Sequence, residues 1–358
     1  MHIAIDASRT TVPRLTGTER YALELTRALI HLNTAHHITL YFRDRPSADL
    51  FPASPLVTQR IIPFKRAWTH LRFAAALWQD RPDVTWVPAH TLPFAFPGRA
   101  VVTVHDLGYK HFPQAHPGRS RLYLDATTRY SAARARRILA DSQATADDLT
   151  RFYRTAAAKI RVVYPGVGAP TITEVDIREK YALPERYFLF IGTLQPRKNI
   201  ARIVQAYAQY RTQSDVPAAL VLVGKKGWLF DAAWVQGIDG VILPGYVDED
   251  DKGVLLAEAL GLVFPTLYEG FGFPVIEAMH CGTPVIASNT SSLPELVGEA
   301  GLLVDPLDVG GIAAAMRQLH HQPDLCTRLI QAGYAQAARF TWERAAKQAL
   351  DALEDAAQ

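Results

Sequence analysis

The sequence is poor in cysteine and lacks any long apolar run. Its two cysteines, Cys281 and Cys326, form no spacing pattern of the kind that marks a metal site or a disulfide framework. Two thiols in 358 residues predict a reduced, cytoplasmic protein. The longest apolar run, around Ala259–Pro265, is too short and too broken to span a bilayer. No signal peptide is expected ahead of the first predicted strand, His2–Asp6.

Acidic residues are scarce in the first half of the chain, and basic residues are scarce in the second half. Residues 1–168 hold 23 Lys and Arg against 12 Asp and Glu, whereas residues 169–358 hold 15 against 23. The net charges of the two halves are therefore +11 and −8, which sum to the +3 of the whole chain. A basic half joined to an acidic half predicts that the first half faces an anionic partner, although charges spread over a solvated surface would give the same counts.

Arginines follow one another between Arg119 and Arg137 with little acidic relief, and Arg129, Arg136 and Arg137 are predicted to share one helical face. Aromatic residues are not interleaved with them as in a nucleic-acid site, so anionic headgroups or an anionic acceptor are the expected partners. The stretch Trp68–Trp78 has the composition of an amphipathic segment that leans on a membrane. A helix that packs on its own sheet explains that stretch better.

Short β-branched runs alternate with helical patterns along the whole chain. Near-continuous apolar strands separated by helices predict parallel sheets that are covered on both faces. Two such sets predict an α/β protein with two doubly wound, Rossmann-like domains, in which ligands bind beyond the carboxyl ends of the strands. The predicted strands are His2–Asp6, Ile38–Phe42, Val84–Val87, Val101–His105, Arg137–Ala140, Ile160–Tyr164, Tyr187–Ile191, Ala219–Val223, Val241–Leu243, Leu262–Pro265, Val285–Ala287 and Leu302–Val304.

A Pro- and Gly-rich stretch, Tyr164–Pro170, lacks any regular period and marks the predicted domain boundary. The expected ranges are 1–168 for the first domain, 169–338 for the second and 339–358 for a final helix. Two domains joined by so short a connection should enclose a cleft that opens and closes.

The stretch Glu269–Glu277 is the most informative in the sequence. Gly270 and Gly272 allow a sharp bend and a close approach to a ligand, and Pro274 suits the first position of a helix. Backbone amides at such a turn donate to oxygens, while the carboxylates of Glu269 and Glu277 accept from hydroxyls. This pattern predicts a site that holds a polyol, although a plain glycine-rich strand-to-helix turn would look the same locally.

Two sites in the first half lie after predicted strands. Thr16 and Glu19 have the spacing of a capping box, and Gly17 would then lie at a helix N-terminus. No G-x-G-x-x-G follows the first strand, which argues against dinucleotide binding. The strand that ends in His105 and Asp106 offers an imidazole and a carboxylate to the same edge, although a lone histidine is more often structural.

Several strands of the second half also run into glycine turns. After Ile191 the chain reads Gly192–Asn199, which places Arg197 and Lys198 beside the start of a helix. Two cations and unpaired amides at a strand-to-helix turn predict a phosphate site. Three similar turns follow later strands: Leu222–Trp228, Leu243–Asp248 and Ser291–Glu295.

Together these residues resemble the glycosyltransferase family 4 enzymes, which have the GT-B fold, over essentially the whole chain. Glu269–Glu277 matches the E-x7-E element of that family, and the first loop, Leu15–Arg20, departs from it by having fewer glycines than many relatives. Three other motifs are typical of the family and occur in its order: Gly192-Thr193 with Pro196–Asn199, Cys281–Ser288 and Leu293–Glu295.

The resemblance implies roles for these residues. Arg197 and Lys198 would neutralise the diphosphate of a nucleotide-sugar, Glu277 would accept from the ribose hydroxyls, and Glu269 would hold the transferred sugar. The remaining donor-binding positions that it implies are Gly17, Gly192, Tyr246, Val247, Gly270, Phe271, Gly272, Ser292 and Leu293. His105 would contact the sugar from the first domain, and the last helix would cross back to that domain.

The pairing of Val104–Leu107 with Gly192–Lys198 looks most like the bacterial mannosyltransferases of surface-polysaccharide assembly. That resemblance implies a retaining hexosyltransferase that needs no cofactor or metal. The expected donor is GDP-mannose, with a UDP-sugar such as UDP-glucose as the alternative, and the acceptor is a glycan or a lipid-linked glycan. The expected location is the cytoplasm, at the inner face of the membrane. A nucleotide-sugar epimerase of similar fold is the alternative from another class. An inactive carbohydrate-binding relative would require the loss of Glu269, Arg197 or Lys198, and all three are present.

Overall fold

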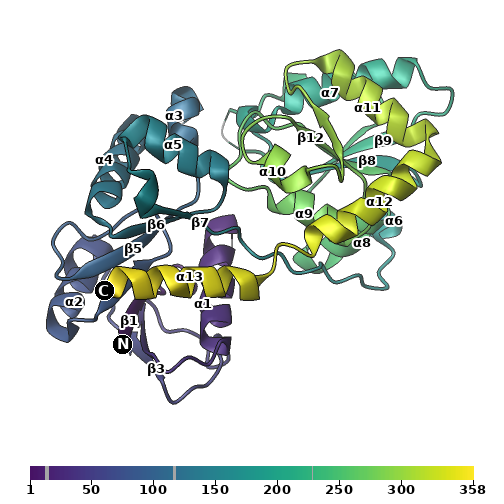
Figure 1. Ribbon diagram of the computed structural model, residues 1–358. Helices are drawn as coiled ribbons and strands as arrows, with labels where there is room; N and C mark the ends of the chain where they lie inside the picture. Colours follow the sequence, from purple (N-terminus) through teal and green to yellow (C-terminus); the bar gives the residue numbers. More distant parts are fainter. Residues whose placement is uncertain (13–15, 116–117, 228) are drawn as a thin grey trace. The chain divides into compact units, whose positions relative to one another are not determined.

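The computed structural model describes residues 1–12, 16–115, 118–227 and 229–358 (Figure 1). Leu15 and Trp228, which belong to two of the predicted turns, lie outside these ranges. The chain divides into two compact units. Unit 1 comprises Met1–Gly166 together with Thr341–Gln358, and unit 2 comprises Val167–Phe340.

Within the described residues, unit 1 is built on a seven-stranded sheet in the order β3-β2-β1-β4-β5-β6-β7, in which every pairing is parallel. The order runs outward from β1 to β3 and then resumes on the other side of β1 with β4. The strands are β1 (His2–Asp6), β2 (His37–Phe42), β3 (Val57–Ile61), β4 (Val84–Val87), β5 (Arg99–Val104), β6 (Arg137–Ala140) and β7 (Ile160–Val162).

Helices cover both faces of this sheet because each strand alternates the sides to which it sends apolar side chains. In β1, Ile3 and Ile5 pack with α1 and α13, whereas Ala4 packs with the helices of the opposite face. The helices of unit 1 are α1 (Gly17–His31), α2 (Ala74–Asp80), α3 (Gly108–His111), α4 (Gly118–Arg134), α5 (Gln143–Tyr153) and α13 (Trp342–Ala357). Shorter turns are η1 (Thr69–Phe73), η2 (Pro113–Ala115) and η3 (Ala157–Lys159).

The last helix, α13, is part of the core of unit 1. It lies beside α1 in Figure 1 and buries a stripe of small residues against the sheet. Small side chains let the helix backbone approach closely, so the stripe gives α13 a large contact without bulk. The buried residues of α13 are Ala345, Ala346, Ala349, Ala352, Leu353 and Ala356.

Unit 2 repeats this plan with six strands among its described residues, in the order β10-β9-β8-β11-β12-β13, all parallel. The strands are β8 (Tyr187–Ile191), β9 (Ala219–Val223), β10 (Val241–Gly245), β11 (Gly261–Phe264), β12 (Val285–Ser288) and β13 (Leu302–Val304). The helices are α6 (Ile177–Tyr181), α7 (Ile200–Thr212), α8 (Lys252–Ala257), α9 (Phe273–His280), α10 (Leu293–Val297), α11 (Val309–His321) and α12 (Pro323–Ala337), with short turns η4 (Pro196–Lys198), η5 (Ala232–Trp234) and η6 (Glu249–Asp251).

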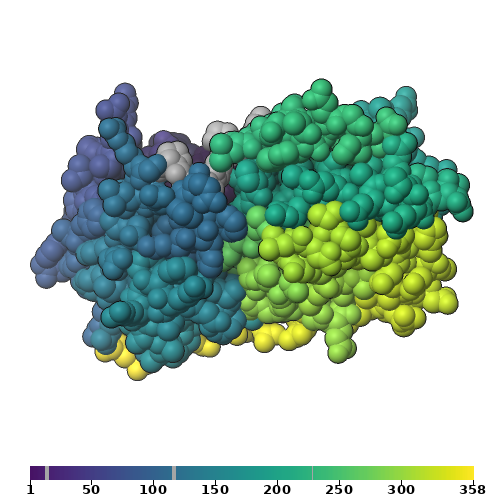
Figure 2. All heavy atoms as spheres, turned by 90° about the horizontal axis from the view of Figure 1, so that it is seen from above, coloured from purple at the N-terminus to yellow at the C-terminus, as the bar shows by residue number. Residues whose placement is uncertain are grey.

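In both units the strand order reverses in the middle of the sheet, between β1 and β4 and between β8 and β11. The reversal separates early from late segments of unit 2, and Figure 2 shows its teal and yellow-green residues on different parts of its surface. Chains that leave neighbouring strands in opposite directions open a crevice at this point, which is where ligands bind in such sheets.

The predicted α/β class with two parallel sheets is confirmed, and every predicted strand is present with bounds shifted by at most two residues. One strand, β3, was not predicted. The Trp68–Trp78 segment does pack on its own sheet, with Phe73, Ala76 and Leu77 buried, but it divides into η1 and α2.

The predicted arginine face is wrong. Helix α4 ends at Arg134 and Arg137 opens strand β6, so these residues do not continue one helix. Arg137 makes a bidentate pair with Asp355 of α13, with Nη2 2.9 Å from Oδ1. Arg134 donates to the Gly98 carbonyl at 2.8 Å. The chain must turn from α4 into the next parallel strand, and that turn ends the helical periodicity.

Candidate active site

Strand β8 ends in a turn that only glycine can form easily. Gly192 has φ of 151°, and its amide donates to the Val223 carbonyl at 2.9 Å. The neighbouring strand end, Gly224, packs so closely that a Cβ there would lie 2.0 Å from the Gly192 carbonyl oxygen. The carboxyl ends of β8 and β9 are thus held backbone against backbone.

The turn that follows, η4, is tied to the end of β11. Asn199 adopts the left-handed conformation at φ of 64°, and its side-chain amide donates to the carbonyls of Pro265 at 2.8 Å and Pro306 at 2.6 Å. The Arg197 carbonyl accepts from the Leu267 amide at 2.9 Å. These bonds bring the predicted phosphate turn beside the segment that leads to Glu269.

Three predicted site residues meet here in one charge cluster. Lys198 Nζ lies 2.6 Å from Glu269 Oε1, and Arg197 Nη1 lies 3.3 Å from Glu269 Oε2. All three side chains are largely buried, with 13%, 18% and 9% of their surfaces exposed for Lys198, Arg197 and Glu269. Lys198 also lies over the Phe264 ring, 5.1 Å from its centroid.

This cluster decides the ionisation of Glu269. Burial by itself would raise the pKa of a carboxyl group, but the charges of Lys198 and Arg197 outweigh it and the pKa of Glu269 is lowered. Glu269 is therefore an anion at neutral pH, held between two cations at the strand reversal of unit 2.

The turn from Glu269 to Gly272 is fastened by two serines. The Glu269 amide donates to Ser291 Oγ at 3.0 Å, and Ser292 Oγ donates to the carbonyls of Glu269, at 3.1 Å, and Phe271. Gly272 precedes α9 at φ of 135°, and a Cβ there would lie 2.8 Å from Leu293 Cδ2. Glycine is therefore required at this position by both conformation and space.

The second carboxylate of the motif, Glu277, lies on α9. The helix begins at Phe273, so Pro274 takes its second position rather than the first. Glu277 Oε1 lies 2.8 Å from Lys252 Nζ, and 4% of the glutamate side chain is exposed. Each glutamate of the motif thus has its own cationic partner.

The other predicted donor positions of unit 2 surround these clusters in sequence and differ in exposure. Gly270 and Phe271 are buried, as are Ser292 and Leu293. After β10, 62% of Tyr246 is exposed, whereas Val247 is buried. Among the residues named here, Tyr246 is the one whose ring is exposed enough for a base to stack on it.

In unit 1, His105 is bracketed by protein groups. Its Nδ1 lies 2.7 Å from Asp141 Oδ2 and its Nε2 lies 3.1 Å from the Pro88 carbonyl, so the protonated ring donates to both. Burial by itself lowers the pKa of His105, but Asp141 and Pro88 outweigh that effect and the pKa is raised. The His105 amide donates to His90 Nε2 at 3.2 Å, and burial beside His105 lowers the pKa of His90 to about 4.

Gly17 lies at the exposed first position of α1, as the capping box predicts. Thr16 is the residue before the helix, and its amide donates to Glu19 Oε2 at 3.2 Å. Gly17 contributes no side chain, so its backbone amide is what this position could offer to an anion.

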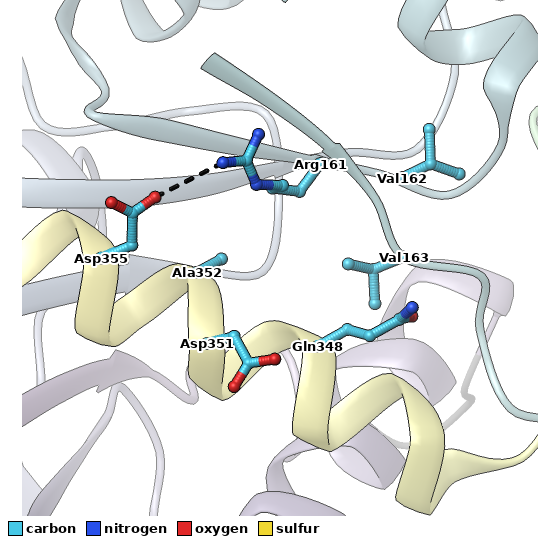
Figure 3. Close-up of a pocket in the computed structure, with 7 residues that line it drawn as sticks. All are labelled: Arg161, Val162, Val163, Gln348, Asp351, Ala352 and Asp355. Atoms are coloured by element: carbon cyan, nitrogen blue, oxygen red, sulfur yellow. Dashed lines mark ion pairs between the residues drawn. The ribbon is translucent and has the colours of Figure 1, made fainter. Parts of the chain in front are cut away.

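A separate cavity of about 340 Å³ lies in unit 1 between β7 and α13. Figure 3 shows its lining, in which Arg161 and Asp355 form an ion pair at 3.6 Å. None of the predicted site residues lines it. Among the described residues, no three His, Cys, Asp or Glu side chains converge as a metal site requires, and no helix is long and apolar enough to cross a bilayer.

Three residues at these sites were not predicted from the sequence: Lys252, His90 and Asp141. Asp141 and His90 follow β6 and β4, so the rule that carboxyl ends of parallel strands meet at one edge could have identified them. Lys252 carries no such signal, because its partner is 25 residues distant in the chain.

Comparison with known proteins assigns a family to both units. Residues 15–169 match the model of Glycosyltransferase Family 4, and residues 174–336 match that of Glycosyl transferases group 1. The O-antigen chain mannosyltransferase B of Escherichia coli is 33% identical over 94% of this chain and 96% of its own length. The O-antigen chain mannosyltransferase RfbU of Salmonella typhimurium is 27% identical over 67% of this chain and 65% of its own length.

Solved structures agree on the fold. The sucrose-phosphate synthase of Thermosynechococcus elongatus superposes with a TM-score of 0.76 at 22% identity, covering 99% of this chain and 98% of the other. WaaG, a glycosyltransferase involved in lipopolysaccharide biosynthesis, superposes with a TM-score of 0.73 at 17% identity over 98% and 99% of the two chains. With a relative one-third identical along nearly the full length of both chains, this protein belongs to the glycosyltransferases of family 4 and has their GT-B fold.

Proposed function

We propose that this glycosyltransferase moves mannose from GDP-mannose to a glycan or lipid-linked glycan acceptor. Two relatives that match much of the chain are named O-antigen chain mannosyltransferases, which supports mannose as the sugar and a growing polysaccharide as the acceptor. A UDP-sugar donor is the alternative within the family, because donor choice rests on a few side chains of the nucleotide pocket.

The observation that carries this proposal is the buried cluster of Arg197, Lys198 and Glu269 at the reversal of the unit 2 sheet. Two cations on a tied turn, next to the strand ends, are suited to a diphosphate. In the absence of an anion they are neutralised by Glu269. An incoming diphosphate would share or take over these cations, which leaves the carboxylate to accept from sugar hydroxyls.

The two glutamates then divide the donor between them. Glu269, with the turn amides near Phe271 and Gly272, would hold the transferred sugar, and Glu277 would accept from the ribose. Val247 and the exposed Tyr246 are placed after β10 to contact the base. From unit 1, His105 would contact the sugar through Nε2, whose bond to the sugar would replace the bond to the Pro88 carbonyl, while Nδ1 keeps its bond to Asp141.

We propose that transfer retains the α configuration. The acceptor hydroxyl would attack the anomeric carbon on the face from which the diphosphate leaves. The bond from that carbon to the diphosphate oxygen breaks, and the hydroxyl proton passes to that oxygen. The cations Arg197 and Lys198 would stabilise the departing charge without a metal. NMR of the product's anomeric centre tests retention, and a β-linked product would refute it. Full activity loss in EDTA, restored by Mg²⁺ or Mn²⁺, would refute the metal-free reaction.

A thermal-shift panel separates the donors. A ligand present at 100 times its Kd stabilises the folded state by about 2.7 kcal/mol, so the cognate nucleotide-sugar should raise Tm most. We expect GDP-mannose to exceed UDP-glucose and ADP-glucose. A larger shift with UDP-glucose would select the alternative donor, and nucleotide release from a donor that is epimerised without any acceptor product would select an epimerase.

We also propose that unit 1 contacts an anionic membrane surface where the acceptor lipid lies. An aromatic patch supports this: His70 stacks on Phe94 with centroids 4.3 Å apart and bonds the Tyr123 hydroxyl at 3.1 Å. Trp78 donates to the carbonyl of Ala95, beside Phe94. About half or more of each of the following side chains of the patch is exposed: Leu71, Trp78, Phe94, Leu122 and Tyr123.

Exposed arginines lie close to this aromatic patch in the chain. Arg72 follows Leu71, and Arg119 and Arg121 precede Leu122. Amphipathic aromatic side chains and basic residues together suit the headgroup region of an anionic bilayer. The binding surface proposed here therefore differs from the arginines 129, 134, 136 and 137, which are bound up in contacts within unit 1 or, for Arg136, lie at the turn into β6.

A further inference from the structure

We infer that Lys252 is a specificity-determining residue that positions Glu277 for the ribose of the nucleotide. The inference rests on the proposed function, in which Glu277 accepts from the ribose hydroxyls. Lys252 would act through Glu277, so it is a positioning residue and not a catalytic one.

The pair is buried and short. Lys252 Nζ lies 2.8 Å from Glu277 Oε1, with 13% of the lysine side chain and 4% of the glutamate side chain exposed. A carboxylate so deeply buried is costly unless a cation or hydrogen-bond donors compensate it. A carboxylate has about four lone-pair sites, so it can accept from the ammonium and from two hydroxyls together. The ammonium fixes the orientation of the carboxylate for that second task.

Lys252 itself is held firmly at the start of α8. The residue before it, Asp251, accepts from Lys180 Nζ and from the Tyr181 hydroxyl, each at 2.6 Å, and both donors belong to α6. The residue after it, Gly253, packs against the chain near Thr171, whose carbonyl oxygen would lie 2.0 Å from an added Cβ. The lysine backbone is therefore clamped on both sides.

Unit 2 contains two charge clusters, and the proposal gives them different roles. Arg197 and Lys198 pair with Glu269 on the side assigned to diphosphate and sugar. Lys252 comes from a different segment, after β10, and pairs with Glu277 and with the half-exposed Glu249. It follows the predicted base positions, Tyr246 and Val247, within six residues of the chain, and this distinguishes it from a phosphate-binding lysine.

The test measures how well the protein tells ribose from deoxyribose. Calorimetry would give Kd for GDP, 2′-deoxy-GDP and 3′-deoxy-GDP with the wild-type protein and with Lys252→Met, Lys252→Arg and Glu277→Gln. Because a hydrogen bond to a charged group contributes about ten-fold or more in affinity, the wild type should prefer GDP over at least one deoxy analogue by roughly that factor. In Lys252→Met the preference should fall to about two-fold or less, and Lys252→Arg should restore most of it.

Two further variants guard against a purely structural effect. In the double variant Lys252→Met/Glu277→Gln, affinity for GDP should be no lower than in Glu277→Gln alone, since both changes remove one function. Arg178→Met removes a half-exposed pair with Glu258 of the same unit, 3.0 Å long, and should leave the ribose preference unchanged. If Lys252→Met does not fold, Lys252→Gln takes its place, and thermal midpoints are measured for every variant.

The outcomes are distinct. A wild-type protein that binds neither GDP nor UDP in any form would sink the proposed function itself. A wild-type protein that prefers ribose, with a preference that survives in folded Lys252→Met, would overturn the role of Lys252 and leave the proposed function standing. The same holds if Arg178→Met loses the preference to the same extent, because a general loosening of unit 2 would then explain both.

Discussion

The two units share one architecture, but their buried polar groups have different kinds of partner. At the strand reversal of unit 2, buried carboxylates are matched to cations that come from other segments: Glu269 to Lys198 and Arg197, and Glu277 to Lys252. In unit 1, the polar centre is a histidine whose two ring nitrogens are both occupied by protein acceptors.

This difference indicates a division of labour. Ion pairs can exchange partners, so the cations of unit 2 can pass from a carboxylate to an incoming diphosphate if hydroxyl groups then donate to the carboxylate. The His105 ring is bonded to a carboxylate and to a backbone carbonyl, and these two partners hold the ring in one orientation. This contrast supports the proposal that unit 2 takes up the donor and that unit 1 supplies a preset contact.

The variant Glu269→Gln tests this difference between the units with the largest expected effect. The amide keeps the shape but removes the anion that both cations share, so the sugar keeps only a neutral acceptor and the two cations are left buried without compensation. We expect kcat/KM to fall by about 10²–10³-fold, the range for loss of one preorganised polar group, while GDP alone still binds. Steady-state kinetics and calorimetry measure both quantities. Near-normal turnover in this variant would remove Glu269 from the site.

Removal of either cation should affect binding of the donor. Lys198→Ala should weaken the affinity for the diphosphate by roughly 1–3 kcal/mol, or about 5–150-fold, because charged hydrogen bonds to phosphate are lost. Arg197→Ala should behave alike. Arg211→Ala, which breaks a surface pair with Asp239 at 3.4 Å, is the comparison variant. An unchanged Kd and kcat/KM in both folded site variants would contradict the phosphate assignment.

Unit 1 should respond differently. Asp141→Asn removes the carboxylate that raises the pKa of His105, so the histidine loses its proton at a lower pH. We expect kcat to fall about ten-fold and the alkaline limb of the pH–rate profile to shift to lower pH. The Kd for GDP should not change. If Kd for GDP changes as much as kcat, the division between the units is wrong.

The membrane proposal separates two surfaces of unit 1. Trp78→Ser and Leu122→Ser should each reduce co-sedimentation with anionic vesicles about three-fold or more, because exposed apolar area is lost. Arg129→Gln should have little effect, and binding should weaken as salt is raised. Vesicle binding that is absent, or equal in all variants, would leave the aromatic patch without a lipid partner.

The smallest effect is a contrast in pH dependence. The lowered pKa of Glu269 contributes stability that is present above about pH 4.5 and is lost as pH falls through the folded-state value. The raised pKa of His105 contributes stability that is present below about pH 6.5 and is lost as pH rises through its folded-state value. Denaturant unfolding of Glu269→Gln and His105→Gln against the wild type, from about pH 2 to about pH 9, should show differences of opposite slope, below pH 4.5 for Glu269 and above pH 6.5 for His105. Slopes of one sign would contradict this.

Much of the fold was predictable because parallel strands buried on both faces read as continuous apolar runs. The strand that was not predicted, β3, reads Val-Thr-Gln-Arg-Ile at the edge of its sheet, where half of its side chains are solvated. An edge strand with so little apolar content has the composition of a loop. The same reasoning explains the wrong arginine face, since local spacing does not reveal where α4 ends.

The candidate site was predictable only where neighbouring residues in the chain are neighbours in space. The turn Pro196–Asn199 and the element Glu269–Glu277 each carry their chemistry in one short stretch. The pairing of Lys252 with Glu277 is not readable in this way, because it depends on how α8 packs beside α9. A basic residue after four acidic ones gives no sign of a distant partner.

The chain order of unit 1 has a consequence for synthesis on the ribosome. Its core is not finished when Gly166 emerges, because the apolar face over α1 and the sheet receives α13 only after the whole of unit 2 has been made. Unit 2 is continuous in sequence and can fold as soon as it emerges, whereas domains generally fold in the order of synthesis. The first unit to be translated is therefore the last to be completed. Part of its apolar surface remains exposed to chaperones until Trp342–Ala357 leaves the ribosome.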